Sequence, residues 1–151
     1  MDLLLFKSRA RSSPSHRTVK RRDVEIIQRD GSFLVLLARE PLPLSLGRIA
    51  RDGGFRMSAL CDRIGVSERH LRRVFEEGIG IAPKEWLRQE RMVAARSLLR
   101  SGSPIKEIAS DLGFTTPKMF SRDFQTFHGV KPTDFQRREF DKILTASMQG
   151  A

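Results

Sequence analysis

One pattern of residues occurs twice in this chain of 151 residues, and it limits the fold more than any other feature of the sequence. The segment LCDRIGVSERHLRRVF, residues 60–75, aligns with IASDLGFTTPKMFSRDF, residues 108–124. The offset between the copies is 48 residues as far as Gly65 and Gly113, and 49 residues after them. Two copies are too few for a solenoid, which needs about three stacked repeats for stability. We therefore expect one duplicated module, with one residue inserted in the turn of the second copy.

Capping residues and apolar spacing predict a mainly α-helical chain. The expected helices are Leu44–Arg51, Ser58–Ile64, Ser67–Glu77, Pro83–Arg100, Ile105–Leu112, Pro117–Phe127 and Pro132–Ile143. Expected N-caps, whose side-chain oxygens accept a bond from a free helical N–H, are Ser58, Ser67 and Thr116. Prolines suited to a first helical turn are Pro83, Pro117 and Pro132. Residues expected to end helices are Ser101-Gly102, Gly80 and Gly129.

The first 43 residues have a different composition from the rest of the chain. Lys7–Arg22 is basic, rich in serine and without apolar periodicity, which predicts a disordered arm. Asp30-Gly31 stands between two aliphatic runs, which favours a β-hairpin. An amphipathic helix is the competing prediction there, and Gly31 counts against it. Pro41 and Pro43 indicate a boundary before the main domain.

The charge balance favours an anionic partner. Lys and Arg outnumber Asp and Glu by 28 to 18, a formal net charge of +10, which is typical of nucleic-acid binding and less often of membrane or acidic-protein binding. A single cysteine, Cys61, excludes an intramolecular disulfide and a cysteine-cluster zinc site, and it fits a reducing cytoplasm. MDLLLF is too short for a signal peptide, and no run reaches the roughly 18 apolar residues of a membrane helix.

Each copy of the repeat has the order of a helix-turn-helix: a short helix, a turn with glycine, and a second helix capped by Ser or Thr. In such a unit the second helix enters the DNA major groove, with its N-terminal residues reaching base edges. The residues expected to face inward are Leu71, Val74, Phe75, Phe120, Phe124 and Phe127. Aromatic rings can also stack on single-stranded bases, but the i, i+4, i+7 spacing favours a core. The residues expected to contact DNA are Arg69, Arg72, Arg73, Lys118, Ser121 and Arg122.

The helix expected between the two copies has the length of a spacer. Pro83–Arg100 contains 18 residues, which corresponds to about 27 Å at 1.5 Å per residue. A rod of that length could hold two recognition helices roughly one DNA turn, about 34 Å, apart.

These motifs resemble a known family. SERHLRRVF…G…PKEWL…ER…AARSLL, followed by IKEIASDLGF…FSRDF…FHGVKPTDFQRR, is similar to the DNA-binding domain of AraC/XylS bacterial transcription regulators. The resemblance runs from about Leu44 to Arg138. It implies seven helices, binding of a monomer to two successive major grooves of double-stranded DNA, and frequent activation through contact with RNA polymerase. It also places the six DNA-contact candidates in the base-reading positions of the two recognition helices.

The resemblance implies three segments. They are 1–43, a basic arm and hairpin; 44–143, the DNA-binding domain, with helix-turn-helix motifs at 58–77 and 105–127 and a linker helix at 83–100; and 144–151, a tail. The 43 residues before Leu44 are far fewer than the family's common effector domain. This favours either a stand-alone activator or a relic or partner-binding element, and no small-molecule effector is evident.

Three positions depart from the family pattern. Pro117 and Lys118 stand where polar uncharged residues are common, which affects the expected preference of the second half-site. Asp123 occupies a position that is usually small or apolar, matching Val74 in the first copy. It either pairs with a neighbouring arginine or weakens the second module's hold on phosphate.

No enzyme class fits the sequence. It has no Gly-rich phosphate loop, no His/Glu metal set, and no Ser or Cys beside a paired histidine, so we expect no catalytic residue, cofactor or metal. His70 and His128 are expected to be structural or near phosphate, Cys61 a small core residue, and Trp86 a packing anchor. The alternative function is an accessory or anti-regulator protein that binds RNA polymerase or another regulator and has only non-specific affinity for DNA.

Overall fold

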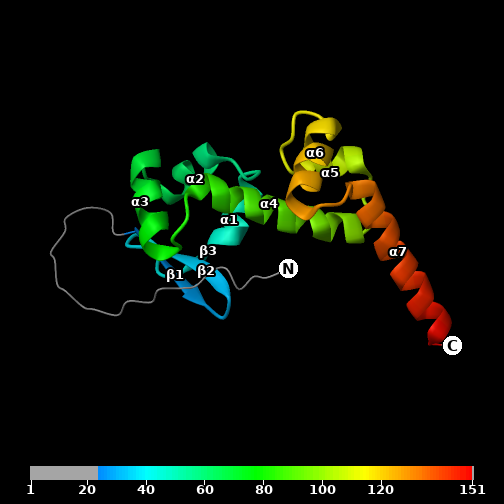
Figure 1. The fold of residues 1–151 in the computed structure, drawn as a ribbon. Coiled ribbons are helices and arrows are strands. Elements are labelled where there is room, and N and C mark those ends of the chain that lie inside the picture. Colours follow the sequence, from blue (N-terminus) through cyan, green and yellow to red (C-terminus); the bar gives the residue numbers. More distant parts are fainter. Residues whose placement is uncertain (1–23, 151) are drawn as a thin grey trace. The chain divides into compact units, whose positions relative to one another are not determined.

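The computed structural model describes residues 24–150 (Figure 1). Within this range the chain is mainly α-helical with one small sheet, as predicted. The elements are β1 Val24–Arg29, β2 Ser32–Leu37, β3 Leu44–Ser45, α1 Leu46–Asp52, α2 Met57–Ile64, α3 Glu68–Gly78, α4 Pro83–Arg100, α5 Ile105–Asp111, α6 Pro117–His128 and α7 Pro132–Gln149. The chain forms two compact units, the first ending at Leu87 and the second beginning at Arg88. The predicted arm, Lys7–Arg22, lies outside the described residues.

The hairpin prediction is confirmed, and the competing helix is wrong. β1 and β2 pair antiparallel with Val24 opposite Leu37. Asp30 and Gly31 form the two-residue turn with φ of 50° and 76°. Positive φ at both turn residues matches the twist of the paired strands, and Asp-Gly adopts it readily.

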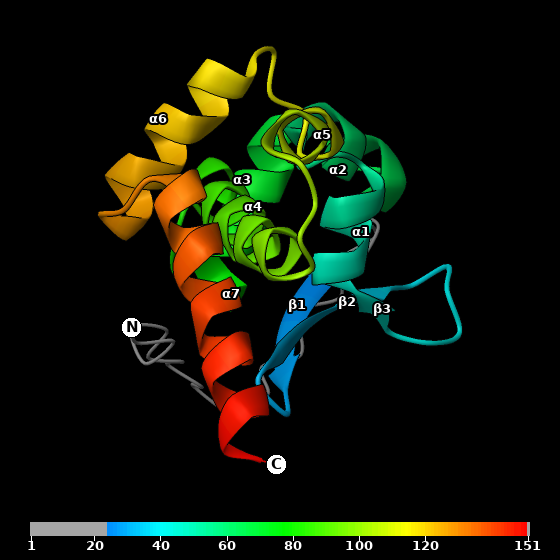
Figure 2. The same cartoon turned by 90° about the vertical axis from the view of Figure 1, so that its right-hand side faces the viewer.

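A third strand was not predicted. β3 pairs with β2, placing Leu44 opposite Val35, so the helix expected from Leu44 begins only at Leu46. Ser45 is the N-cap of α1, because its Oγ accepts a hydrogen bond from the Arg48 amide at 3.3 Å. Both views place the sheet on the side of α1 that faces away from α2 (Figures 1 and 2).

In the first unit, β1 packs on α3 and β2 packs on α1. Trp86, in the first turn of α4, is 1% exposed and meets the Phe75 ring edge-on, with centroids 5.5 Å apart. Its expected role as a packing anchor is confirmed. The buried apolar residues of this unit include Ile26, Val35, Leu37, Leu46, Ile49, Leu60, Ile64, Leu71, Val74, Phe75, Trp86 and Leu87.

In the second unit, which begins at Arg88, α5 packs on α6 and α6 packs on α7, and α4 makes hydrogen bonds with α6 and α7. Its buried apolar residues include Met92, Ala95, Leu99, Ile108, Ala109, Leu112, Phe120 and Phe124. α7 continues to Gln149, beyond the predicted end at Ile143. The residues it adds are exposed, so local helix propensity rather than packing accounts for the extra turns.

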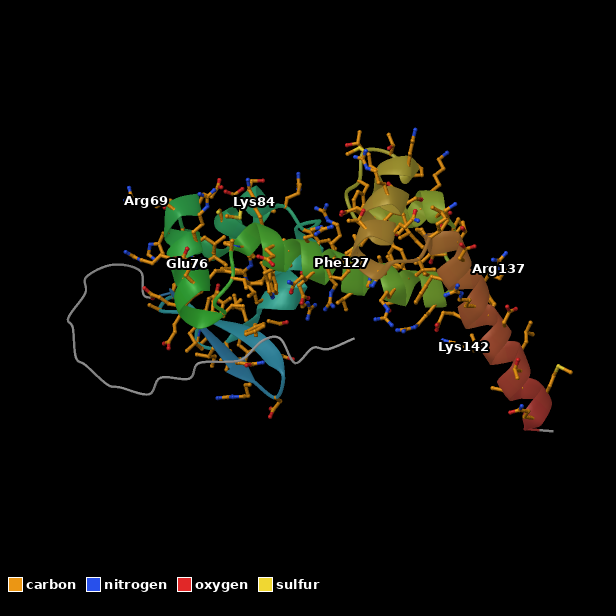
Figure 3. All side chains as sticks on the ribbon, viewed as in Figure 1. Arg69, Glu76, Lys84, Phe127, Arg137 and Lys142 are labelled. Carbon is orange, nitrogen blue, oxygen red and sulfur yellow. The ribbon has the colours of Figure 1, made fainter. Side chains whose placement is uncertain are left out.

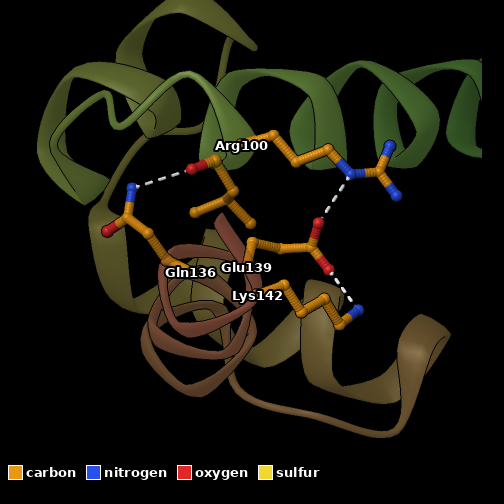
Figure 4. A network of polar contacts seen from close by, with 5 residues as sticks. Arg100, Gln136, Glu139 and Lys142 are labelled. Atoms are coloured by element: carbon orange, nitrogen blue, oxygen red, sulfur yellow. Dashed lines mark hydrogen bonds and ion pairs between the residues drawn. The ribbon is translucent and has the colours of Figure 1, made fainter. Parts of the chain in front are cut away.

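Polar contacts attach α7 to the end of α4 (Figure 4) and to the loop after it. The Gln136 amide donates to the Leu99 carbonyl at 3.2 Å and to the Ser103 carbonyl at 2.9 Å. Glu139 accepts from Lys142 at 2.9 Å and from Arg100 at 3.1 Å. These bonds from Lys142 and Arg100 lower the pKa of Glu139 below its ordinary value.

The helix starts confirm two of the three predicted N-caps. Ser67 accepts from the His70 amide and Thr116 from the Met119 amide, each at 3.2 Å. The prediction for Ser58 is wrong, because α2 begins at Met57 and Arg56 occupies the N-cap position. A tight turn through Gly53, Gly54 and Phe55, the last two at positive φ, brings Arg56 into that position before Ser58 is reached. Pro83, Pro117 and Pro132 each open a helix, as expected.

The helix ends also follow the sequence. Gly129 caps α6 at φ 73° and Gly102 follows α4 at φ 83°. Gly80, expected to cap α3, is displaced by one residue, because Ile79 is the cap and Gly80 follows it at φ 88°. Among the described residues, no helix is long and apolar enough to cross a membrane. The predicted division of the chain after residues 43 and 143, and the predicted spacing of the recognition helices, stay predictions.

We expect Gly78→Ala to destabilise the first unit. A Cβ at Gly78 would lie 2.8 Å from both the Cβ and the carbonyl oxygen of Ile26, so backbone must move. The cost of such overpacking is about 1–3 kcal/mol, more than the ~1 kcal/mol that alanine gains in helix propensity. Urea unfolding followed by the fluorescence of Trp86, the only tryptophan, reports on this unit. Glu77→Ala is the exposed control, and a Gly78→Ala protein as stable as wild type would contradict the prediction.

Candidate nucleic-acid interface

α3 is a short helix whose inner face is fully packed. It starts at the Ser67 cap, directly after Gly65 reverses the chain at φ 80°. Leu71, Val74 and Phe75 are at most 5% exposed, which confirms the predicted inward stripe. Their burial fixes which side chains of α3 face solvent.

The outer face of α3 is cationic. Arg69, Arg72 and Arg73 are all exposed, and Figure 3 shows Arg69 projecting outward from the helix. Arg72 is paired within the helix, its Nη2 lying 2.6 Å from Oε1 of Glu68. Both partners are about half exposed, so this contact orients Arg72 more than it stabilises the fold.

α6 also has a buried inner face and an exposed outer face, formed by different side chains. Phe120 and Phe124 are fully buried, as predicted. Phe127, predicted to complete the stripe, is only half-buried at the last turn of α6, where the Arg88 guanidinium lies 5.5 Å from its ring centroid. Figure 3 marks Phe127 at the end of α6.

The outer face of α6 carries two cations and one unexpected apolar side chain. Lys118 and Arg122 are exposed and Ser121 is half-buried. Met119, in the first turn, is 44% exposed. Sequence reasoning missed Met119, although its repeat partner is His70, on the same turn of α3. An exposed apolar side chain at the N-terminal end of a recognition helix can contact a thymine methyl group.

Asp123 pairs with an arginine of α4, which is one of the two alternatives expected for it. Arg88 donates to Oδ1 of Asp123 from Nη2 at 2.9 Å and from Nε at 3.3 Å. The carboxylate is therefore neutralised beside the cationic face of α6. The sequence did not identify Arg88 as the partner of Asp123, because these residues are 35 positions apart and no local pattern links them.

Other arginines of α4 lie over aromatic rings of the second unit. The Arg91 guanidinium is 4.9 Å from the Phe114 centroid, and those of Arg96 and Arg100 are 5.6 and 5.7 Å from Phe135. Cations favour the electron-rich ring face. Burial lowers the pKa of Arg91, while Asp123 opposes that shift.

His128 has a structural position, one of the two alternatives expected for it. Its ring centroid lies 4.4 Å from that of Phe124, and its Nε2 donates to the Met92 carbonyl at 3.3 Å. Burial lowers the pKa of His128, the bond to Met92 partly offsets this, and the charge of Arg96 adds to the lowering.

Cys61, expected to be a small core residue, is only half-buried. Burial raises the pKa of its thiol, and the carboxylates of Glu68 and Asp62 raise it further. A thiol kept protonated is a weak nucleophile and a weak metal ligand. In residues 24–150, no group of three or more His, Cys, Asp or Glu side chains could hold a metal ion.

Comparison with known proteins gives a family match over more than half of the chain. A model described as a helix-turn-helix domain matches residues 60–138. The transcriptional activator RhaR of Yersinia pseudotuberculosis is 32% identical over 102 residues, which are 66% of this chain and 35% of RhaR. The chain thus spans about a third of the length of this relative.

Two solved structures share the fold. The C-terminal domain of AraT, a response regulator from Geobacillus stearothermophilus, is 28% identical with a TM-score of 0.52, over 67% of this chain and 88% of that one. The DNA-binding domain of the global transcriptional factor AdpA, in complex with a target DNA, is 24% identical with a TM-score of 0.56, over 64% of this chain and 91% of that one.

We expect the second unit to lose stability as the pH falls below about 6.5, the ordinary pKa of histidine. His128 has a lowered pKa in the folded chain, so the unfolded chain binds its proton first and stability falls with pH. His128→Gln should flatten this dependence, because glutamine can still donate to Met92 but does not titrate. Unfolding measured by circular dichroism between about pH 8 and pH 5 tests this, with the half-buried His70→Gln as control. Equal pH dependence in wild type and His128→Gln would contradict it.

Proposed function

Because this chain belongs to the AraC/XylS family of transcription regulators, we propose that it binds double-stranded DNA sequence-specifically and regulates transcription, as an activator. The observation that supports this best is the pair of capped helices, α3 and α6, each buried on one face and cationic on the other. The activator named RhaR among its relatives supports the direction of regulation.

The proposed roles follow from exposure and position. Arg69 and Arg73 of α3 read base edges in one major groove, since arginine can form two parallel hydrogen bonds to guanine. Arg72 acts together with Glu68, which holds its guanidinium. In the next groove, Lys118 and Arg122 of α6 make the corresponding contacts, with Ser121 beside them.

The net charge of +10 adds a sequence-independent attraction. Each phosphate contact releases condensed counterions, so affinity should fall steeply with salt concentration. In this proposal base contacts provide the specificity, while phosphate contacts provide much of the affinity.

The proposed partners are promoter DNA and RNA polymerase, and the protein acts in the bacterial cytoplasm, where that DNA lies. We propose no enzymatic step and no small-molecule effector for the described part of the chain. The three segments 1–43, 44–143 and 144–151 remain our proposed domain division.

One selection experiment tests the function. Binding sites are selected from a random DNA pool, and the protein is then bound to the best site in a large excess of unrelated DNA. A specific regulator keeps its site, because specific binding exceeds non-specific binding by roughly 10³–10⁷. An accessory protein with only electrostatic affinity would enrich no site and lose its DNA to the competitor, which would overturn the proposal.

We expect Arg69→Ala and Arg73→Ala each to weaken binding to the selected site by about 1–3 kcal/mol and to relax preference at one or two base pairs. Arg137→Ala is the control for charge, since Arg137 is exposed on α7 and projects away from that helix (Figure 3). Binding to the selected site and to random DNA is measured by fluorescence anisotropy. Equal losses on both DNAs would identify phosphate contacts and contradict the base-reading role.

We also expect simultaneous reading of two half-sites. Inserting about five base pairs between them turns the second by half a helical turn, onto the other side of the DNA. We propose that the connection through helix α4 is too stiff to follow this rotation, so affinity should fall by about 10² or more as the benefit of two linked contacts is lost. An insertion of one full turn serves as comparison. Unchanged affinity after the half-turn insertion would show that only one half-site is used.

A further inference from the structure

The hairpin and the turn after it, residues 24–40, contact the first helix-turn-helix at two separate places. The first is the C-terminal end of α3, where Gly78 lies against Ile26 of β1. Ile26 is 4% exposed, and the two backbones approach so closely that a Cβ on Gly78 would lie 2.8 Å from the Ile26 carbonyl oxygen. Only glycine allows this approach, so β1 holds the end of α3 directly.

The second contact is at the turn between α2 and α3. Nη2 of Arg39 donates to the Arg63 carbonyl, in the last turn of α2, at 2.7 Å. Nη1 of Arg39 lies over Gly65, 2.5 Å from where a Cβ would stand. A cation at this end of a helix is favourable because free carbonyls give it a partial negative charge. The next residue, Glu40, lies 3.5 Å from the Arg63 side chain.

We propose that residues 24–40 form a brace that holds α3 in its reading orientation, with Arg39 as a positioning residue. One contact fixes the C-terminal end of α3, and the other fixes the turn that leads into its N-terminal end. This proposal rests on the proposed function, in which α3 reads base edges. Paired hydrogen bonds to a base lose strength quickly when distances or angles change, so a loosened turn should reduce specificity first.

The second copy of the repeat offers an internal comparison. In that copy α6 packs against α5 and α7, whereas the brace contacts α3 and the turn before it. Loosening the brace should therefore reduce discrimination at the base pairs read by α3 and leave those read by α6 unchanged.

Two variants of Arg39 separate positioning from phosphate contact. Arg39→Lys keeps the charge but replaces the planar fork with a single ammonium group, and Arg39→Met removes the charge as well. Arg48→Met is the matched control, because it removes one cation from the same unit at an α1 side chain that is 79% exposed. Trp86 fluorescence during urea unfolding confirms that the first unit is folded in each protein.

Each protein is bound to the selected site, and to sites with single base pairs changed in either half, over a range of salt concentrations. We expect both Arg39 variants to reduce discrimination in the first half-site by about five- to tenfold. Discrimination in the second half-site, and the salt dependence for Arg39→Lys, should stay at wild-type values. Arg48→Met should keep wild-type discrimination in both halves.

Three results would overturn the brace. The first is unchanged discrimination in both Arg39 variants. The second is an equal loss of affinity for all sites, seen with Arg39→Met but not with Arg39→Lys. It would come with a salt dependence of binding whose slope is lower by about 0.9, which identifies a phosphate contact. The third is equal relaxation of both half-sites. If Arg39→Met does not fold, the result for Arg39→Lys decides. Failure of the proposed function is distinct, since wild type would then show no preference among sites.

Discussion

The structure depends on one aromatic contact that is present in both copies of the repeat. Phe75 and Phe124 occupy equivalent positions on α3 and α6, and both are fully buried. Phe75 meets Trp86 with ring centroids 5.5 Å apart, and Phe124 meets Phe135 at 5.7 Å, each pair at an interplanar angle of 67°. Such edge-on pairs add about 0.5–1.5 kcal/mol to the burial of the rings. They attach each recognition helix to the helix that follows it, and so fix which residues point outward.

The sequence predicted these elements well where the signal was local. The buried stripe of α3, Ser67 and Thr116 as caps, and Asp30-Gly31 as a hairpin turn all act over a few residues, and all were confirmed. Two local predictions were less accurate, since Phe127 is only half-buried and Ser58 is not a cap. Predictions were wrong where a tertiary contact overrode the local signal. β3 displaced the expected start of α1, because Leu44 and Ser45 found a strand partner in β2. The DNA-contact residues themselves stay predictions.

Two polar contacts were not predicted for the same reason, because they depend on tertiary structure. Arg88 with Asp123, and Arg39 with the Arg63 carbonyl, join residues 35 and 24 positions apart. Charged side chains on a helix surface have many candidate partners in a sequence, and only the folded chain selects one. Exposed ion pairs contribute about 0–1 kcal/mol, so the main effect of these contacts is on orientation. Asp123 in particular is turned from a negative charge beside α6 into one half of a neutral pair.

The buried and exposed faces of α3 and α6 differ in how much a substitution costs in stability. Substitutions on exposed helical positions usually change stability by less than about 0.5 kcal/mol, whereas loss of a buried phenylalanine costs about 3–5 kcal/mol. Two buried positions keep large apolar side chains in both copies, because Leu71 matches Phe120 and Phe75 matches Phe124. At outer positions Arg69 matches Lys118 and Arg72 matches Ser121, although Arg73 matches Arg122. The inner face therefore determines that each helix forms, whereas the outer face can change at little cost in stability, which leaves it available for the base contacts that we propose.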